Sequence, residues 1–385
     1  MPKVLILGGR APVALDHARR FATQGWQVVV ADSVSCRLSS WSRSVHSDAR
    51  LPSPRRMPAQ FIAELNRLIR QHRIDMVVPT CEEVFFLSRY RESLPQACRV
   101  ACDDFGKLSA LHSKWNFLAL AREAGGHAPD SALVSDLEQA RAWANGRPVV
   151  LKPEFSRFGV HVRICAQGIA NNMPRLPALG RWVVQAYCEG SEFCSYSIAD
   201  RGRLVAHALY RPLHRLNRSS TYCFEACQHQ EVQNVVARLV AQLEFTGQIS
   251  FDWIESPEGR MHPLECNPRA TSGLHLFDMN DGIPDALLGA TTGLLTPRPG
   301  AVRMLAPVMY GPGLWQAATT SGLDVWRANH GRARDVMCAW PDLAPLAGAM
   351  VDLAWFARTA LARRCSLREA ATSDIEWDGE SLPCL

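Results

Sequence analysis

Residues 251–269 read F-D-W-I-E-S-P-E-G-R-M-H-P-L-E-C-N-P-R, and this segment gives the clearest prediction of local structure in the chain. The central S-P-E-G, residues 256–259, is a strong turn signal because proline and glycine both favour tight turns. Apolar and polar residues are interleaved on both sides of that turn. We therefore predict a β-hairpin, with one strand over residues 247–255 and the other over residues 260–267.

The predicted hairpin brings three polar side chains to one face. With a regular turn Asp252 lies opposite Pro263, so Asp252 and Glu265 are diagonal neighbours roughly 7–8 Å apart at the backbone. Asn267 shares their face because side chains alternate along a strand. Two carboxylates and an amide at this spacing predict a magnesium site that also holds substrate phosphates. A solvated polar face would produce the same alternation, and the apolar residues around these acids argue against it.

Two lysines are candidates for phosphate contacts. Lys152 ends an apolar strand and is followed by a loop that contains Ser156 and Arg157. A lysine at the end of a buried strand, beside such a turn, suits the α- and β-phosphates of a nucleotide. Lys114 lies near the start of a helix predicted as one element over residues 109–125 and capped near Ser109 or Ser113. Taken alone, each lysine is more often a solvent-facing charge.

A third polar motif, V-V-Q-A-Y-C-E-G-S-E-F, covers residues 183–193, where a strand precedes a turn. We predict that Gln185 hydrogen-bonds to an edge of adenine and that Glu192 accepts hydrogen bonds from two ribose hydroxyls. This motif by itself is a weak signal of nucleotide binding. The pattern around the three motifs predicts an α+β region. Its predicted strands cover residues 148–152, 160–165, 182–187, 192–199 and 204–210, and its predicted helix covers residues 230–243.

The chain opens with a predicted doubly wound α/β domain. Its predicted strands cover residues 3–7, 27–31 and 74–80, and a helix is predicted over residues 57–72. The turn after the first strand reads G-G-R-A-P rather than G-x-G-x-x-G, which argues against a nicotinamide site. Glu82 follows a strand at the carboxyl edge, where such domains bind ligands, and is a candidate to receive an amine. An acid at a helix N-terminus is the alternative interpretation.

Composition places the chain among ordinary globular proteins. Of its 385 residues 47% are hydrophobic and 21% are charged, and the formal net charge is +5. That mild excess, without a basic cluster, argues against a nucleic-acid partner. The 13 scattered cysteines contain no C-x-x-C pair, which favours free thiols in a reducing cytoplasm over a zinc site. We find no signal-peptide pattern at the start.

A long Ala/Leu segment over residues 343–362 gives the main signal in the last part of the chain. Pro345, Gly348, Asp352 and Arg358 interrupt it, so we expect no membrane span. Packing against the body of the protein or against a second subunit is the favoured interpretation, and a helix lying in a membrane interface is the alternative.

Taken in order, these pieces resemble the ATP-grasp superfamily of carboxylate–amine ligases and its carbamoyl-phosphate-synthase-like relatives. The ordered set is Lys114, A-G-G-H-A-P-D-S, V-V-L-K-P, Q-A-Y-C-E-G-S-E and E-C-N-P-R, and the match covers about residues 1–295. The resemblance implies an α/β Rossmann-like pre-ATP-grasp domain followed by an α+β ATP-grasp module. The implied boundaries are 1–105 for the first domain, 106–180 for the small subdomain or lid, 181–298 for the catalytic subdomain and 299–385 for a C-terminal extension.

The resemblance also implies a role for each motif residue. Those implied to contact ATP phosphates are Lys114, Lys152, Ser156 and Arg157, and those implied to bind Mg²⁺, or Mn²⁺ in its place, are Asp252, Glu265 and Asn267. Those implied to hold the adenosine are Gln185, Tyr187, Cys188 and Glu192. Arg269 and Lys152 would act on the transferring phosphoryl group. The phosphate loop has one glycine where many relatives have several. We therefore expect Arg157 to make some of the phosphate contacts that backbone amides make in those relatives.

These roles imply a cytoplasmic enzyme that joins a carboxylate to an amine through an acyl phosphate and releases ADP and phosphate. Both substrates would be small molecules, and the candidates to hold them are Glu82, Arg211 and Arg215. The two arginines are predicted in a loop, where a solvated basic surface is the alternative. Bicarbonate activation in the manner of biotin carboxylase, and a non-catalytic regulatory protein that binds ATP, stay open as other functions. Many relatives pair as homodimers, which the resemblance leaves open for this chain.

Overall fold

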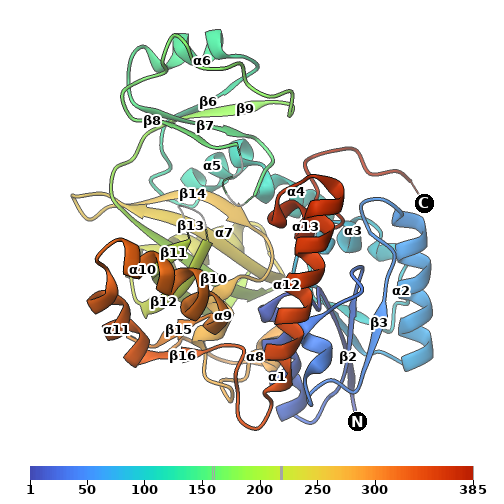
Figure 1. Ribbon diagram of the computed structural model, residues 1–385. Coiled ribbons are helices and arrows are strands. Elements are labelled where there is room, and N and C mark those ends of the chain that lie inside the picture. Colours follow the sequence, from blue (N-terminus) through green and yellow to red (C-terminus); the bar gives the residue numbers. More distant parts are fainter. Residues whose placement is uncertain (158, 160, 217–219, 385) are drawn as a thin grey trace.

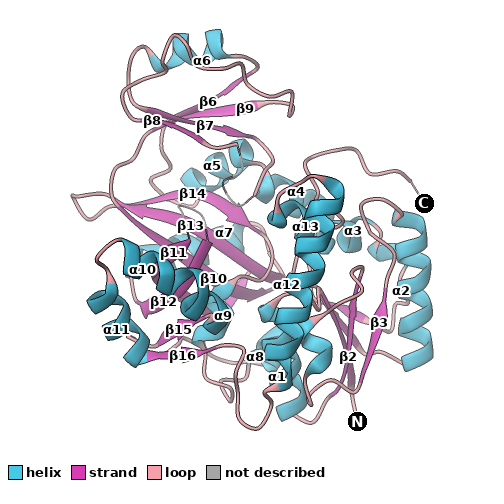
Figure 2. Cartoon of the chain, in the orientation of Figure 1, coloured by secondary structure: helices cyan, strands magenta, loops and turns pink. Residues whose placement is uncertain are grey.

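Three β-sheets organise the chain in the computed structural model, which describes residues 1–157, 159, 161–216 and 220–384 (Figure 1). A five-stranded sheet belongs to the N-terminal domain and a seven-stranded sheet lies beside it. A four-stranded sheet stands apart at the top of the view, joined to the rest on one side only (Figure 2). The helix α12 (Ala344–Arg363) runs down the front of the view between the two larger sheets.

The N-terminal domain is the doubly wound α/β unit that the sequence predicts. Its strands are all parallel, in the order β3-β2-β1-β4-β5. The strands are β1 (Lys3–Leu7), β2 (Gln27–Asp32), β3 (Ser47–Arg50), β4 (Met76–Val78) and β5 (Arg99–Val100), and the helices are α1 (Pro12–Thr23), α2 (Pro58–His72), α3 (Glu83–Arg89), η1 (Leu38–Trp41) and η2 (Arg91–Ser93). Val4 and Ile6 pack with α1, whereas Leu5 and Leu7 pack with α2 on the opposite face.

Two helices, α4 (Phe105–His112) and α5 (Lys114–Glu123), replace the single helix predicted over residues 109–125. The chain breaks at Ser113, whose backbone is extended and whose Oγ caps α5 by accepting the Asn116 N–H at 3.1 Å. The same hydroxyl donates to Glu154 Oε1 at 2.6 Å. The single-helix prediction is wrong because the partner that stabilises the break is far away in the sequence. The predicted cap at Ser113 is confirmed, as the N-cap of α5. Lys114 therefore begins a helix of its own.

Replacing Ser113 with alanine is expected to lower the free energy of unfolding by about 1–2 kcal/mol, because α5 loses its cap and buried Glu154 loses a donor. Chemical denaturation measures this. Ser109→Ala is the matched control, since Ser109 lies within α4 and its hydroxyl has no hydrogen-bond partner among the described residues. Equal stability of the two variants would contradict the role given to Ser113.

The four-stranded sheet has the order β6-β9-β7-β8 and is covered by α6 (Leu137–Ala144). Its strands are β6 (Ser131–Val134), β7 (Val149–Pro153), β8 (Arg163–Cys165) and β9 (Trp182–Ala186). β8 is shorter than the strand predicted over residues 160–165, of which Val160 lies outside the described residues. β9 falls within the range 181–298 that the resemblance gives to the catalytic subdomain. It nevertheless pairs with β6 and β7 of the small subdomain.

The seven-stranded sheet has the order β14-β13-β10-β11-β12-β15-β16. Its strands are β10 (Ser191–Asp200), β11 (Arg203–Leu216), β12 (Ser220–Cys227), β13 (Gly247–Glu255), β14 (Met261–Asn267), β15 (Val302–Met304) and β16 (Ala333–Asp335). One face packs against α5 and α7 (Gln230–Gln242), and the other packs against η3 (Ser272–Leu276) and α8 (Ile283–Leu287). The edge strand β16 and its neighbour β15 come from the region predicted as a C-terminal extension.

β11 runs as far as Leu216, so Arg211 and Arg215 lie in a strand and not in the predicted loop. The register between β11 and β12 shifts next to His214. Pro212 and the basic residues around it are typical of a loop, which is why the prediction is wrong. A strand accepts such a proline where a bulge interrupts the ladder of hydrogen bonds.

The hairpin β13–β14 forms as predicted, but its register differs. Trp253 pairs with Pro263 and Asp252 pairs with Glu265, so Leu264 is the extra residue of a bulge. The predicted pairing of Asp252 with Pro263 is therefore wrong. The two carboxylates lie directly opposite each other, closer than the predicted diagonal arrangement.

The C-terminal region packs against the body of the protein, as the sequence favours. Its helices are α9 (Ala306–Val308), η4 (Met309–Gly313), α10 (Leu314–Thr319), α11 (Leu323–Arg332), α12 and α13 (Leu367–Thr372). α12 packs on η1, where Asp352 Oδ2 accepts the Leu38 N–H at 2.8 Å. A Cβ at Gly348 would lie 2.7 Å from Trp41, so only glycine fits this contact. Within the described residues, no helix is both long and apolar enough to cross a membrane.

Candidate active site

Asp252 on β13 and Glu265 on β14 form an acidic pair at the centre of the candidate site. Burial and the negative charge of Glu265 raise the pKa of Asp252. Burial would also raise the pKa of Glu265, but Lys114 and Lys152 outweigh it and hold that pKa below its usual value. Two carboxyl groups side by side in a half-buried place, next to two cations, are an arrangement that a divalent cation would stabilise.

Lys114 and Lys152 reach this pair from different elements. Lys114 begins α5, and its Nζ donates to Ser156 O at 2.6 Å and lies 3.6 Å from Glu265 Oε2. Lys152 lies on β7, and its Nζ donates to the carbonyl of Leu264 at 3.0 Å. Burial lowers the pKa of Lys152 to about 8. Both lysines are buried, so neither is the solvent-facing charge that a lone lysine usually is.

Gln185 on β9 is buried beside Lys152. Its Oε1 accepts from Lys152 Nζ at 3.0 Å and its Nε2 donates to Ser131 Oγ at 3.3 Å. The side-chain amide therefore positions Lys152, and its predicted contact with adenine stays a prediction. Tyr187 and Cys188 follow β9, and the Tyr187 N–H donates to Pro148 O at 3.1 Å. Their predicted role beside adenine also stays a prediction.

Glu82 joins two arginines at the edge of the site. It is 1% exposed, forms an ion pair with Arg157, and its Oε1 lies 3.7 Å from Arg269 Nε. Burial raises the pKa of Glu82, and the two arginines oppose that rise. Arg269 Nη2 in turn donates to Asn267 Oδ1 at 3.2 Å. The position predicted to receive an amine is thus taken by two guanidinium groups of the chain itself.

The sequence reasoning missed one contributor, the C-terminal segment (residues 374–380). Glu376 Oε1 lies 3.5 Å from Arg157 Nε, and the Trp377 N–H donates to Glu82 Oε2 at 3.4 Å. The available signal was the run D-I-E-W-D-G-E, in which four acids surround one tryptophan. Nothing in the run itself indicates which distant residues it contacts.

Three predicted residues lie apart from this cluster. Glu192, Arg211 and Arg215 line a cavity of about 800 Å³ bounded by β10, β11 and α10–α11. Arg215 forms an ion pair with Glu192, and Arg211 Nη2 donates to Glu225 Oε2 at 2.6 Å. Both arginines already have a carboxylate partner, and the predicted contacts of all three with substrate or ribose stay predictions.

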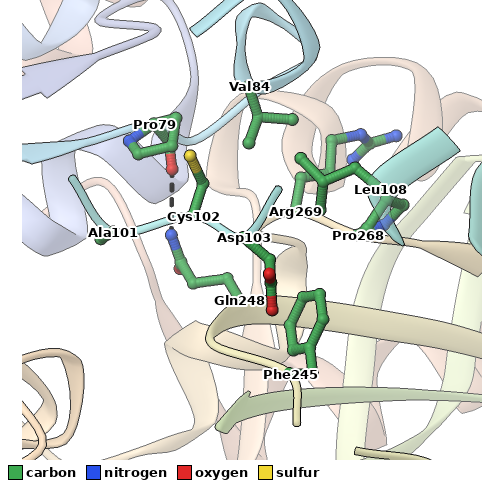
Figure 3. Close-up of a pocket in the computed structure, with 10 residues that line it drawn as sticks. All are labelled: Pro79, Val84, Ala101, Cys102, Asp103, Leu108, Phe245, Gln248, Pro268 and Arg269. Carbon is green, nitrogen blue, oxygen red and sulfur yellow. Dashed lines mark hydrogen bonds between the residues drawn. The ribbon is translucent and has the colours of Figure 1, made fainter. Parts of the chain in front are cut away.

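The junction between the N-terminal domain and β13 is tightly packed. Figure 3 shows Gln248 pointing toward Pro79, where its Nε2 donates to the Pro79 carbonyl at 2.9 Å. Asp103 Oδ2 accepts the Thr246 N–H at 2.6 Å in the same region. The space between these residues has no room for a water molecule, so it is a structural contact and not a ligand site. This contact fixes the hairpin, and with it Arg269, relative to the end of β4.

The donors at the acidic pair fit Mg²⁺. Within the described part of the chain, no group of three His, Cys, Asp or Glu side chains is arranged to hold a metal. Asp252, Glu265 and Asn267 therefore offer a partial set of oxygen ligands. Such a set suits Mg²⁺, which is usually held by one or two carboxylates, with water and substrate phosphates as its other ligands.

The arrangement of the three sheets is the ATP-grasp fold that the sequence resemblance implies, and solved structures share this fold. N5-carboxyaminoimidazole synthetase from Staphylococcus aureus superposes with a TM-score of 0.63 at 14% identity, over 83% of this chain and 85% of that chain. The L-amino acid ligase from Bacillus licheniformis gives 0.57 at 13% identity, over 78% of each chain. The biotin carboxylase domain of Hydrogenobacter thermophilus 2-oxoglutarate carboxylase gives 0.59 at 14% identity, over 78% and 73%. No family model matches the sequence.

Proposed function

We propose that this protein is an ATP-dependent ligase that joins a carboxylate to an amine. The observation that carries the proposal is the convergence of Lys114 and Lys152 on Asp252 and Glu265, with Arg269 nearby. Buried cations suited to phosphate oxygens and half-buried acids suited to Mg²⁺ form one cluster. Phosphoryl transfer needs this combination, because its catalysis consists mostly of positioning and charge neutralisation.

In the proposed reaction a carboxylate oxygen attacks the γ-phosphorus of ATP, the bond to ADP breaks and an acyl phosphate forms. The amine nitrogen then attacks the acyl carbon, phosphate leaves, and the nitrogen loses a proton. Lys114 and Lys152 would bind phosphate oxygens, and Arg269 would neutralise charge on the transferring group. Asp252 and Glu265 would hold Mg²⁺, which when bound supplies further charge neutralisation on the phosphates.

The ligands of solved neighbours support ATP and Mg²⁺ as ligands of this site. N5-carboxyaminoimidazole synthetase from Staphylococcus aureus has been solved with ADP, and the 2-oxoglutarate carboxylase domain with MgADP and bicarbonate. The bicarbonate in that neighbour makes bicarbonate activation the second candidate function for this chain. The same neighbour is a dimer, and a homodimer stays a prediction here.

The test measures ADP, AMP and phosphate released from MgATP with pooled carboxylic acids, with and without pooled amines. We expect ADP and phosphate in equal amounts, and sustained turnover only when an acid and an amine are both present. AMP and pyrophosphate would contradict the acyl-phosphate reaction. ADP release that needs only bicarbonate would favour the second candidate. MgATP binding without turnover in any pool would favour a regulatory protein.

A further inference from the structure

The C-terminal segment lies on the carboxyl ends of the parallel strands of the N-terminal domain. Arg10, in the turn after β1, donates from Nη1 to Asp374 Oδ1 at 2.8 Å and from Nε to Asp32 Oδ1, at the end of β2, at 3.0 Å. Burial would raise the pKa of Asp374, but Arg10 outweighs it and keeps that pKa below its usual value. This edge is where α/β domains commonly bind ligands, and here the chain itself fills it.

Trp377 anchors the segment to two parts of the molecule at once. It is 3% exposed, and its ring centroid lies 5.0 Å from that of Phe85 on α3 and 5.2 Å from that of Phe155. Phe155 belongs to the loop that follows β7 in the four-stranded sheet. Gly379 reinforces the contact, because a Cβ there would lie 2.4 Å from the Phe155 ring. The segment therefore bridges the N-terminal domain and the four-stranded sheet.

Ion pairs also connect the N-terminal domain to the four-stranded sheet through this segment. Arg157, two residues beyond Phe155, is buried between Glu82 of the N-terminal domain and Glu376 of the segment. Glu376 is itself held by Thr372, which donates to its Oε1, and by Arg55, whose Nη1 lies 3.7 Å from its Oε2. The loop that carries Ser156 and Arg157 is thus fixed from outside its own sheet.

We propose that the C-terminal segment (residues 374–380) holds this loop in place, and that Glu376 is a positioning residue for Arg157. The four-stranded sheet projects from the body, so contacts at its base decide how firmly its loop is placed (Figure 1). A loop that is already ordered loses less conformational entropy when it binds a ligand. As a consequence, which rests on the proposed function, Glu376 should strengthen MgATP binding without contacting MgATP.

The first experiment needs no nucleotide. Trypsin cleavage after Arg157 is timed in the full-length Glu376→Gln variant and in Glu380→Gln, the matched control. Glu380 belongs to the same segment, and its one charged partner among the described residues is Arg55, at 3.3 Å. We expect about tenfold faster cleavage in Glu376→Gln and the wild-type rate in Glu380→Gln. Thermal unfolding of both variants shows whether the effect is local. Equal cleavage in the two variants would overturn the proposal.

The second experiment measures the Kd of MgATP by calorimetry in a double-mutant cycle. Glu376→Gln should weaken binding about tenfold, the effect of losing one charge-assisted contact. Arg157→Gln should weaken it at least as much, and the double variant should be no weaker than Arg157→Gln alone, because the two residues act as a unit. If the two substitutions instead raise the Kd by independent factors that multiply in the double variant, Glu376 does not act by positioning Arg157. If the wild type does not bind MgATP but the expected difference in trypsin cleavage is seen, the proposed function is wrong. The proposed contact between the segment and the loop is then still supported.

Discussion

Replacing Glu265 with glutamine is expected to reduce ADP formation by about 100-fold or more. Loss even of outer residues around a metal costs about 10–100-fold, and Glu265 would be a direct ligand. Glutamine keeps the shape of the side chain but removes the charge that faces Lys114 and Lys152. Mg²⁺ would then be held mainly by Asp252, so raising the Mg²⁺ concentration should restore part of the activity. The assay is initial-rate ADP release at several Mg²⁺ concentrations.

Glu258→Gln is the matched control for this prediction, because it makes the same chemical change in the turn of the same hairpin. Glu258 is exposed and lies outside the cluster, so its variant should retain the wild-type rate. If Glu265→Gln keeps more than about a tenth of the wild-type rate, the carboxylate is not needed for metal binding, and the proposed site for Mg²⁺ is wrong.

The hairpin shows how far a local pattern predicts this site. The S-P-E-G turn and the pattern around it place Asp252 and Glu265 on neighbouring strands and on one face, as the structure has them. The pattern cannot predict the bulge at Leu264, because a bulge depends on how both strands and their neighbours pair. The pairing of Asp252 is therefore wrong in the prediction, although the grouping of the acids is right.

Contacts between distant parts of the chain are the part that the sequence does not predict. The local sequence around each residue of this cluster is ordinary. Glu82 follows a strand, Arg157 lies in a loop and Glu376 lies in a polar tail. Only the folded chain brings them together. Ser113 is similar, since its bond to Glu154 decides where α4 ends. A local sequence pattern reflects the element to which a residue belongs, whereas these three contacts each join two different elements.

Trp377→Ala is expected to lower the free energy of unfolding by about 3–5 kcal/mol, as is usual for removing a buried tryptophan. That is a large effect for one substitution, since the free energy of unfolding of a whole protein is only about 5–15 kcal/mol. The reason is its packing: the indole contacts the rings of Phe85, Phe105 and Phe155, which come from three different elements. Chemical denaturation followed by circular dichroism measures the loss.

Trp377→Phe separates packing from hydrogen bonding in this prediction. Phenylalanine keeps an aromatic ring among the same neighbours but loses the bond from Trp377 Nε1 to Glu380 O, which is 2.8 Å long. Its cost should be well below that of alanine, since one hydrogen bond contributes about 1 kcal/mol net and the smaller ring loses only part of the buried area. A loss below about 1 kcal/mol in Trp377→Ala would mean that the ring is not packed in solution. The C-terminal segment would then not hold the loop that carries Arg157.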